Sequence, residues 1–400
     1  MNRDRLAIFG GRPVRDDRLP YGRQSITESD IEAVADVLRS DWITSGPKVD
    51  EFESAFAATV GARHAVSFSS GTAALHGATF AARLGAGDEA ITTPLTFCAT
   101  ANAVLYQGAT PVFAEIRNDT LTIDPADVEA RVTPRTRAIL PVDYAGHPAD
   151  LDAIVDIADR HRLVVIEDAA HALGARYRTR GVGAISHMTV FSFHPVKHIT
   201  TGEGGMVTTN DDALAARLRT FRGHGIDTDA RTRQSQGQWY YEMTALGFNY
   251  RLTDIACALG LSQLPRLAES LARRRAIAAR YRAELIDTPL LRLPANSDDI
   301  EHAWHLFPVR IDAPLDRGKV FRALRAEGLG VNVHYVPVHL HPYYRERFGY
   351  RDGDYPLAER ASSELISLPM FHGMTEQDID DVITAVCRVM THYVSGASIA

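Results

Sequence analysis

Cysteine, lysine and long apolar runs are all scarce in this sequence of 400 residues. The three cysteines, Cys98, Cys257 and Cys387, lie far apart and show no metal-ligand spacing. Such a sparse and odd count predicts no metal site and no disulfide framework, and it favours a reducing compartment. No stretch approaches the roughly 20 apolar residues of a membrane span, and the opening residues lack the apolar run of a signal peptide. We therefore expect a cytoplasmic protein without a membrane partner.

A large excess of charge of one sign is missing too. The formal net charge is −7, and the arginines are scattered rather than gathered in runs, so nothing indicates a nucleic-acid-binding surface. Hydrophobic residues make up 45% of the chain and charged residues 23%, which is typical of a globular protein. A chain of this length can form a large core and is expected to divide into two domains.

Short apolar runs alternate with helical patterns between about residues 50 and 210. This alternation predicts an α/β protein with a mostly parallel sheet covered by helices on both faces. A later strand, helix and strand pattern over 302–340 predicts a smaller α/β domain. We predict that residues 1–261 form an N-terminal arm together with a large domain, and that residues 262–400 form a small C-terminal domain. Strand candidates of the large domain include "HAVSFS" (64–69), "AITT" (90–93), "LVVIED" (163–168) and "MTVFSF" (188–193).

Lysine is the residue whose scarcity is most informative. The chain has three lysines against forty arginines, and one of the three, Lys197, lies in "FSFHPVKHITTGEGG" (191–205) at the end of a strand candidate. A lysine amine can lose its proton and form a Schiff base with an aldehyde, whereas an arginine guanidinium stays charged. We interpret Lys197 as a Schiff-base lysine in preference to a surface charge.

Two further features lie at strand ends of the same predicted sheet. In "SFSSGTAALHGA", Ser70, Gly71 and Thr72 open a helix, where free N–H groups can bind a phosphate. A helix cap with a glycine turn explains these three residues equally well. Asp168 ends a buried strand, where its carboxylate could pair with a protonated pyridine nitrogen. A helix cap is again the alternative.

Three side chains could complete such a site. Phe97 follows a strand end and could stack on an aromatic cofactor, or simply pack in the core. His171 could face the cavity of Asp168, although a lone histidine is more often structural. Ser192 could add a hydroxyl to a phosphate. In their order along the chain, these features describe a pyridoxal 5′-phosphate site with a phosphate cradle, a ring stack, a pyridinium partner and a Schiff-base lysine.

The motifs "EDAAHALGA", "FSFHPVKHITTGEGG" and "LGFNYRLTDIACALGLSQL" resemble the DegT/StrS family of sugar aminotransferases, and the likeness runs over almost the whole chain. The resemblance implies the type I fold of PLP-dependent transferases, with a large mixed, mostly parallel sheet and a smaller C-terminal α/β domain. It implies that Lys197 carries the cofactor, that Asp168 binds its ring nitrogen and that Phe97 stacks on the ring. It further places Gly71, Thr72 and Ser192 at the phosphate and His171 near the ring.

The resemblance also implies a homodimer with shared active sites. In this family the asparagine of "GFNYR", here Asn249, reaches the phosphate held by the neighbouring subunit. Dehydratases of the family carry histidine where its transaminases carry lysine, in a run similar to "HHITMGEGG". The residues here are Lys197 and His198, which favours the transaminase and leaves the role of His198 open.

Several segments, among them "SDWITSGPKV" and "GVNVHYVPVHLHPYY", are similar to aminotransferases of pseudaminic acid biosynthesis. Those enzymes aminate C4 of a UDP-linked 4-keto-6-deoxy-N-acetyl sugar with L-glutamate as donor, and their cofactor passes through pyridoxamine phosphate. The opening "LAIFGGRPVR" is more similar to relatives that act on antibiotic sugars or keto-cyclitols. We name Thr44, His334 and His339 as candidate substrate residues, with a structural role the equal alternative for each histidine.

Other functions stay open at this stage. An aminotransferase for a dTDP-keto-sugar or a keto-cyclitol, a dehydratase of the same family and a non-catalytic regulator with the same fold are the alternatives. The intact cofactor positions disfavour the regulator. A Rossmann-type dehydrogenase is set aside because no G-x-G-x-x-G follows an early strand.

Overall fold

A seven-stranded sheet lies at the centre of the structure, a computed structural model that describes residues 5–297 and 299–397. Strand β10 runs antiparallel to β2 and β9, whereas the pairs from β9 to β4 run parallel. This mixed, mostly parallel sheet is the one that the alternating sequence pattern predicts. In spatial order its strands are β2 (His64–Phe68), β10 (Gly205–Thr209), β9 (Met188–Ser192), β6 (Val164–Asp168), β5 (Thr136–Leu140), β3 (Glu89–Thr92) and β4 (Thr110–Phe113).

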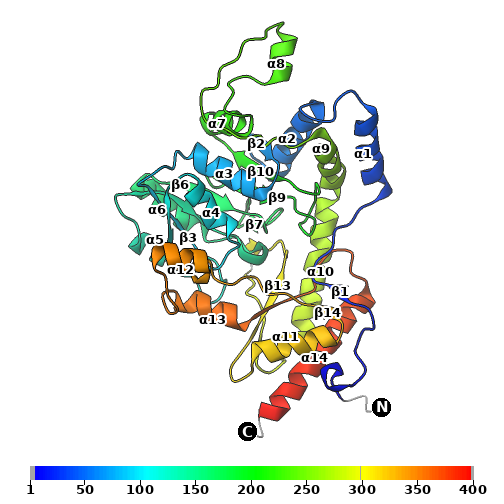
Figure 1. The fold of residues 1–400 in the computed structure, drawn as a ribbon. Helices are drawn as coiled ribbons and strands as arrows, with labels where there is room; N and C mark the ends of the chain where they lie inside the picture. Colours follow the sequence, from blue (N-terminus) through cyan, green and yellow to red (C-terminus); the bar gives the residue numbers. More distant parts are fainter. Residues whose placement is uncertain (1–4, 298, 398–400) are drawn as a thin grey trace.

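Helices cover both faces of the sheet (Figure 1). Neighbouring residues of a strand point to opposite faces, so Val190 joins the apolar cluster under α3 and α7, and Phe191 joins the cluster under α2. The Phe191 ring packs edge-on against Phe56, with 5.2 Å between ring centroids. Burial on both faces explains the unbroken apolar run in this strand. The helices are α2 (Pro47–Val60), α3 (Gly71–Ala81), α4 (Ala99–Tyr106), α5 (Pro125–Ala130), α6 (Leu151–His161) and α7 (Asp212–Arg222).

A second core forms around a three-stranded antiparallel sheet in the C-terminal part. The ring of Tyr281 meets that of Phe307 edge-on, with 5.1 Å between centroids, and both side chains are fully buried. The strands are β11 (Leu291–Arg292), β13 (Phe307–Ile311) and β15 (Leu365–Leu368), and the helices are α10 (Leu267–Leu285), α11 (Arg317–Ala326) and α14 (Glu376–Ala397).

The N-terminal arm joins this C-terminal core. Strand β1 (Leu19–Pro20) pairs in parallel with β14 (Leu329–Gly330), and Leu6 is fully buried in the same apolar cluster. The Glu327 carboxylate accepts the backbone N–H of Ala7 at 2.8 Å and that of Val14 at 3.1 Å. The sequence groups the arm with the large domain, but its buried contacts are with the small one.

The proposed division between residues 261 and 262 falls inside α9 (Asp254–Gln263). The next helix, α10, contributes Leu267 and Leu271 to the core beside the large sheet, and Ile277 and Tyr281 to the C-terminal core. The change from one core to the other therefore occurs along a single helix, which no break in the sequence pattern marks.

Two segments differ from the expected pattern. Residues 331–340, predicted as a strand, form no strand, because Pro337 has no N–H to donate and Val338 N–H bonds the Pro94 carbonyl instead, at 2.8 Å. Residues 224–250 leave the body of the molecule and carry α8 (Ala230–Ser235) at their outer end (Figure 1). The remaining elements are α1 (Glu28–Arg39), β7 (Arg176–Tyr177), β8 (Arg180–Gly181), β12 (Ile300–Glu301), α12 (Pro342–Phe348) and α13 (Pro356–Glu364).

No helix within the described residues is both long enough and apolar enough to cross a membrane.

Candidate active site

A cavity of about 420 Å³ opens where the parallel strands end. Asp168 is the last residue of β6, Ser192 is the last residue of β9, and Lys197 follows on the next loop. The carboxyl ends of parallel strands are where open α/β sheets form their sites. Of the residues singled out from the sequence, this cavity is lined by Ser70, Gly71, Thr72, Phe97, Asp168, His171, Ser192, Lys197 and His334.

One end of the cavity is the start of α3. The first N–H groups of a helix have no partner inside it. The Ser70 hydroxyl caps the helix by accepting the Ala73 N–H at 3.0 Å, so the N–H groups of Gly71 and Thr72 stay available to an anion. The start of α3 is therefore compatible with both interpretations of the sequence, the helix cap and the anion site. A Cβ on Gly71 would lie 3.0 Å from the Ser192 Cβ, so a larger residue would crowd the Ser192 hydroxyl out of this end.

At the floor of the cavity, the Asp168 carboxyl is held by two hydrogen bonds. Thr100 Oγ1 donates to Oδ2 at 2.7 Å, and Ala170 N–H donates to Oδ1 at 3.1 Å. Burial raises the pKa of Asp168, while these donors and the nearby Lys197 amine act in the opposite direction. A buried carboxylate needs a cationic partner to stay charged. A protonated pyridine nitrogen is such a partner.

Lys197 shares the cavity with Asp168. Burial lowers the pKa of its amine to about 8, against the opposing attraction of Asp168 and with a further contribution from Arg274. An amine in this range is partly uncharged near neutral pH and can attack an aldehyde. The amine, the carboxyl, the anion cradle at α3 and the 57% exposed ring of Phe97 together fit pyridoxal phosphate.

The sequence did not identify three further side chains of the cavity. Thr100 lies one helical turn after Phe97, and that spacing could have indicated it. His305 and Tyr335 come from the C-terminal part, where no periodic pattern marks them. His305 Nε2 lies 3.4 Å from the Lys197 amine, and Tyr335 OH lies 3.1 Å from His171 Nε2.

Three predicted residues lie elsewhere in this chain. Thr44 and Asn249 are exposed and pair with Thr253 and Gly223 in isolated bridges, away from Lys197. His339, proposed to line the substrate pocket, is fully buried outside this cavity, and its Nε2 lies 3.0 Å from a Glu359 oxygen. That contact agrees with the alternative interpretation of His339 as a structural residue.

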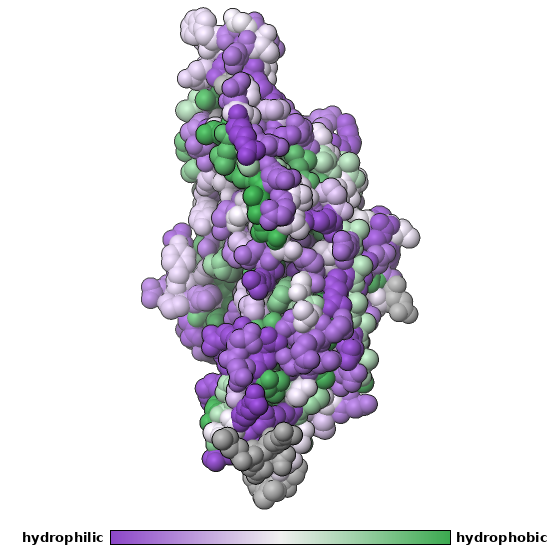
Figure 2. Space-filling model, turned by 90° about the vertical axis from the view of Figure 1, so that its right-hand side faces the viewer, coloured by the Kyte–Doolittle hydropathy of each residue, from purple (hydrophilic) through white to green (hydrophobic). Residues whose placement is uncertain are grey.

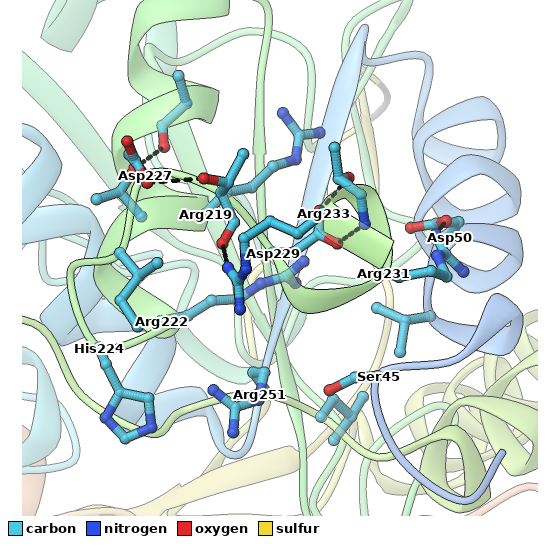
Figure 3. A pocket seen from close by; sticks show the side chains of 18 of the residues that line it. Ser45, Asp50, Arg219, Arg222, His224, Asp227, Asp229, Arg231, Arg233 and Arg251 are labelled. Atoms are coloured by element: carbon cyan, nitrogen blue, oxygen red, sulfur yellow. Dashed lines mark hydrogen bonds and ion pairs between the residues drawn. The ribbon is translucent and has the colours of Figure 1, made fainter. Parts of the chain in front are cut away.

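A second cavity, of about 600 Å³, lies between α2, α7 and the segment that carries α8. Figure 3 shows arginine side chains of α7, α8 and the following loop among those that line it, and Arg231 pairs with Asp50 of α2. Its lining includes Ser45, which follows Thr44 in the sequence, and Arg251, which lies two residues after Asn249. It contains no lysine among its lining residues and is separate from the Lys197 cavity.

Known proteins resemble the chain over nearly its full length. SpsC of Bacillus subtilis, a spore coat polysaccharide biosynthesis protein, is 46% identical over 377 residues, which are 93% of this chain and 97% of SpsC. The solved structure of Helicobacter pylori PseC, an aminotransferase of pseudaminic acid biosynthesis, has 31% identity and a TM-score of 0.88, covering 94% of this chain and all of PseC.

A third relative, Spr1654 of Streptococcus pneumoniae, has been solved in a PLP form and a PMP form. The PLP form has 30% identity and a TM-score of 0.88, and the match covers 94% of this chain and 99% of that one. These likenesses confirm the predicted fold class.

The sequence profile of the DegT/DnrJ/EryC1/StrS aminotransferase family matches residues 24–387. The motifs that suggested this family, the mixed sheet and the residues Asp168 and Lys197 of the cavity all lie within the matched range. The chain belongs to the DegT/DnrJ/EryC1/StrS aminotransferase family.

Proposed function

We propose that this protein transfers the amino group of L-glutamate to C4 of a nucleotide-linked 4-keto-6-deoxy sugar, with a UDP-linked N-acetyl sugar as the first candidate. As a family member it is a sugar aminotransferase with pyridoxal phosphate as cofactor. The observation that carries the proposal is the single cavity that unites the Lys197 amine, the Asp168 carboxyl and the open start of α3. The sugar assignment rests on the likeness to PseC and on the polysaccharide pathway of SpsC.

Each residue of the cavity has a defined task in this proposal. Bound pyridoxal phosphate supplies an electrophilic aldehyde and a ring that withdraws electrons. Lys197 would hold the aldehyde through Nζ, and its free amine would carry a proton as general base and acid. Asp168 keeps the ring nitrogen protonated, and Thr100 holds the Asp168 carboxylate in place. The α3 start and Ser192 bind the phosphate.

His171 has a more limited task. Its Nδ1 accepts the Ala145 N–H at 3.3 Å, so the ring proton sits on Nε2 and is directed at the Tyr335 oxygen. Burial lowers the pKa of His171 well below its usual range, and the neighbouring titratable side chains act in the same direction. In this proposal His171 serves as a neutral wall of the cavity beside the cofactor ring.

A homodimer with shared sites is part of the proposal. Asn249, predicted to act on the neighbouring subunit, is exposed and pairs with Gly223 where the α8 segment returns to the body of this chain. Large apolar side chains are exposed near it and along α1, and Figure 2 shows apolar surface gathered in the upper half of that side of the molecule. Exposed apolar surface of this kind indicates a protein interface. Six of these residues are Ile31, Leu38, Trp42, Trp239, Met243 and Leu246.

The test of the substrate is a glutamate-dependent assay against a panel of keto compounds. UDP-linked 4-keto sugars, dTDP-linked keto sugars and scyllo-inosose are supplied in turn, 2-oxoglutarate release is followed, and NMR locates the new amino group. We expect turnover with a UDP-linked N-acetyl 4-keto sugar and amination at C4. Preference for a dTDP sugar or scyllo-inosose would replace the substrate with one of the alternatives. A colourless protein that takes up no pyridoxal phosphate would support the regulator instead.

A further inference from the structure

We propose that His305 is a positioning residue for Lys197, whose uncharged amine it holds by donating the hydrogen on its Nε2. The inference builds on the role of Lys197 proposed above. His305 lies outside the motifs that indicate the cofactor site, 108 residues after Lys197 in the chain. The two atoms are 3.4 Å apart, a long hydrogen bond of the kind that active sites often show before a substrate binds.

The surroundings of the His305 ring decide which nitrogen carries its hydrogen. The ring is 4% exposed, and its Nδ1 has no hydrogen-bond partner within residues 5–297 and 299–397. A hydrogen on Nδ1 would be a buried donor without an acceptor, which is rare and costly. A hydrogen on Nε2 has an acceptor, the lone pair of the Lys197 amine. Because a charged ammonium has no lone pair, this arrangement requires an uncharged Lys197.

The neighbouring histidines, His171 and His198, direct their Nε2 atoms at other partners and not at the Lys197 amine. His171 directs its Nε2 hydrogen at Tyr335, and His198 directs its Nε2 at the Ala303 carbonyl, 2.9 Å away. The His171 and His305 rings pack against each other at a tilt of 40°, with 4.5 Å between centroids, and Nε2 of His305 is the atom that meets the amine. The charged and titratable groups that face Lys197 are Asp168, His171, His198, Arg274, His305 and His334.

A buried arginine fixes the backbone of His305. Arg274 of α10 is 1% exposed, and its Nη1 donates to the carbonyls of Trp304, His305 and Met370 at 3.1, 3.3 and 3.1 Å. Three carbonyls held by one rigid guanidinium leave the loop little freedom. Its positive charge also disfavours a second cation nearby. Arg274 thus sets the place of His305 and adds to the preference for an uncharged Lys197.

The scarcity of lysine makes a direct measurement possible. In full-length protein freed of cofactor and labelled with [ε-¹³C]lysine, NMR should show three lysine signals, with those of Lys48 and Lys319 as internal references. The titration midpoint of Lys197 is then compared in wild type, His305→Phe and His305→Gln. Phenylalanine keeps the ring volume without a donor, and glutamine supplies an N–H donor again.

We expect the midpoint of Lys197 to rise by roughly 0.5 to 1 pH unit in His305→Phe, since a lost hydrogen bond of ordinary strength corresponds to that shift. His305→Gln should return the midpoint toward the wild-type value. An unchanged or lower midpoint in His305→Phe, or a His305→Gln midpoint equal to that of His305→Phe, overturns the proposal.

A second measurement covers the case in which His305→Phe does not fold. Wild-type protein labelled with [¹⁵N]histidine is examined, and the His305 signal is assigned by its loss in His305→Gln. The proposal expects hydrogen on Nε2 in the cofactor-free state, and hydrogen on Nδ1 contradicts it. Neither measurement uses turnover, so a failure here leaves the aminotransferase assignment standing. Loss of the proposed function would appear instead in the substrate assay.

Discussion

Thr100 Oγ1 donates a 2.7 Å hydrogen bond to Asp168 Oδ2, which ties the first turn of α4 to the end of β6. The bond fixes the direction in which the buried carboxylate presents its second oxygen. Hydrogen bonds to a charged group are worth about 1.5 to 3 kcal/mol.

Thr100→Val should therefore lower kcat/KM by roughly 10- to 100-fold, since 1.4 kcal/mol corresponds to a factor of ten. The loss should appear with the cofactor still bound, as judged by its absorbance. Thr100→Ser, which keeps the hydroxyl, is the matched control and should stay within a few-fold of wild type. Equal losses in the two variants would show that the methyl group, rather than the hydrogen bond, matters at this position.

Lys197→Arg keeps the positive charge but removes the primary amine. We expect no covalent attachment of the cofactor and a loss of turnover of at least about 10³-fold, because nucleophile and proton carrier are lost together. The measurement is reduction with borohydride, digestion and peptide mass spectrometry. In wild type the peptide that contains residue 197 should gain the mass of the reduced cofactor. Finding that mass on a different lysine, or retained activity in Lys197→Arg, would contradict the assignment.

The proposed homodimer with shared sites predicts how mixed subunits behave. Lys197→Ala and Asn249→Asp chains should each be inactive as homodimers, since one lacks the amine and the other places a negative charge at the phosphate. In a mixed dimer one of the two sites would receive both wild-type residues. After unfolding and refolding together, an equal mixture should recover about a quarter of wild-type activity, because half of the dimers are mixed and each has one intact site. No recovery would mean that both residues act within one chain.

The buried pair of Glu53 and Arg222 predicts a large effect on stability. Glu53 Oε1 accepts the backbone N–H and the hydroxyl of Ser67, both at 2.8 Å, as well as Arg222 Nη1. Glu53→Ala leaves the arginine charge and the Ser67 donors unpaired, so the free energy of unfolding should fall by about 3 to 5 kcal/mol. Glu51→Ala, on the exposed side of the same helix, is the control and should change it by less than about 1 kcal/mol. Urea unfolding measures both, and similar changes in the two variants would contradict the prediction.

His76 predicts a loss of stability in mild acid. Its ring is 6% exposed among the rings of Tyr106, Phe221 and Phe248, and burial lowers its pKa to about 4. An unfolded histidine has a pKa near 6.5, so between these values the unfolded state binds the proton and the folded state does not. The stability from this residue is complete above about pH 6.5 and is lost as the pH falls toward 4.

Urea unfolding of wild type and His76→Phe at two pH values tests this expectation. Between pH 7 and pH 5, wild type should lose about 2 kcal/mol more than the variant, which has nothing to titrate at this position. Parallel losses in the two proteins would show that His76 has the same pKa in the folded and the unfolded chain, which would contradict the prediction.

The sequence predicted those parts of the fold and site that depend on local patterns. Asp168, Ser192 and Gly71 could be placed because each ends a strand or begins a helix, and the ends of parallel strands meet at one edge. His305 could not, since it reaches Lys197 only through the packing of α10 against a distant loop. His339 looked like its neighbour His334 in sequence, but a bond to Glu359 draws it into the core.

The docking of the N-terminal arm has a consequence for biosynthesis. Ala7 bonds Glu327, a residue 320 positions further along the chain. A ribosome adding roughly 5 to 20 residues per second needs about a quarter of a minute to a minute to make that span. Throughout this interval the C-terminal core that buries Leu6 and Leu19 in the folded protein has not yet been synthesised. The arm must therefore be among the last segments to fold. Its apolar residues stay accessible to chaperones and proteases until the final quarter of the chain has been synthesised.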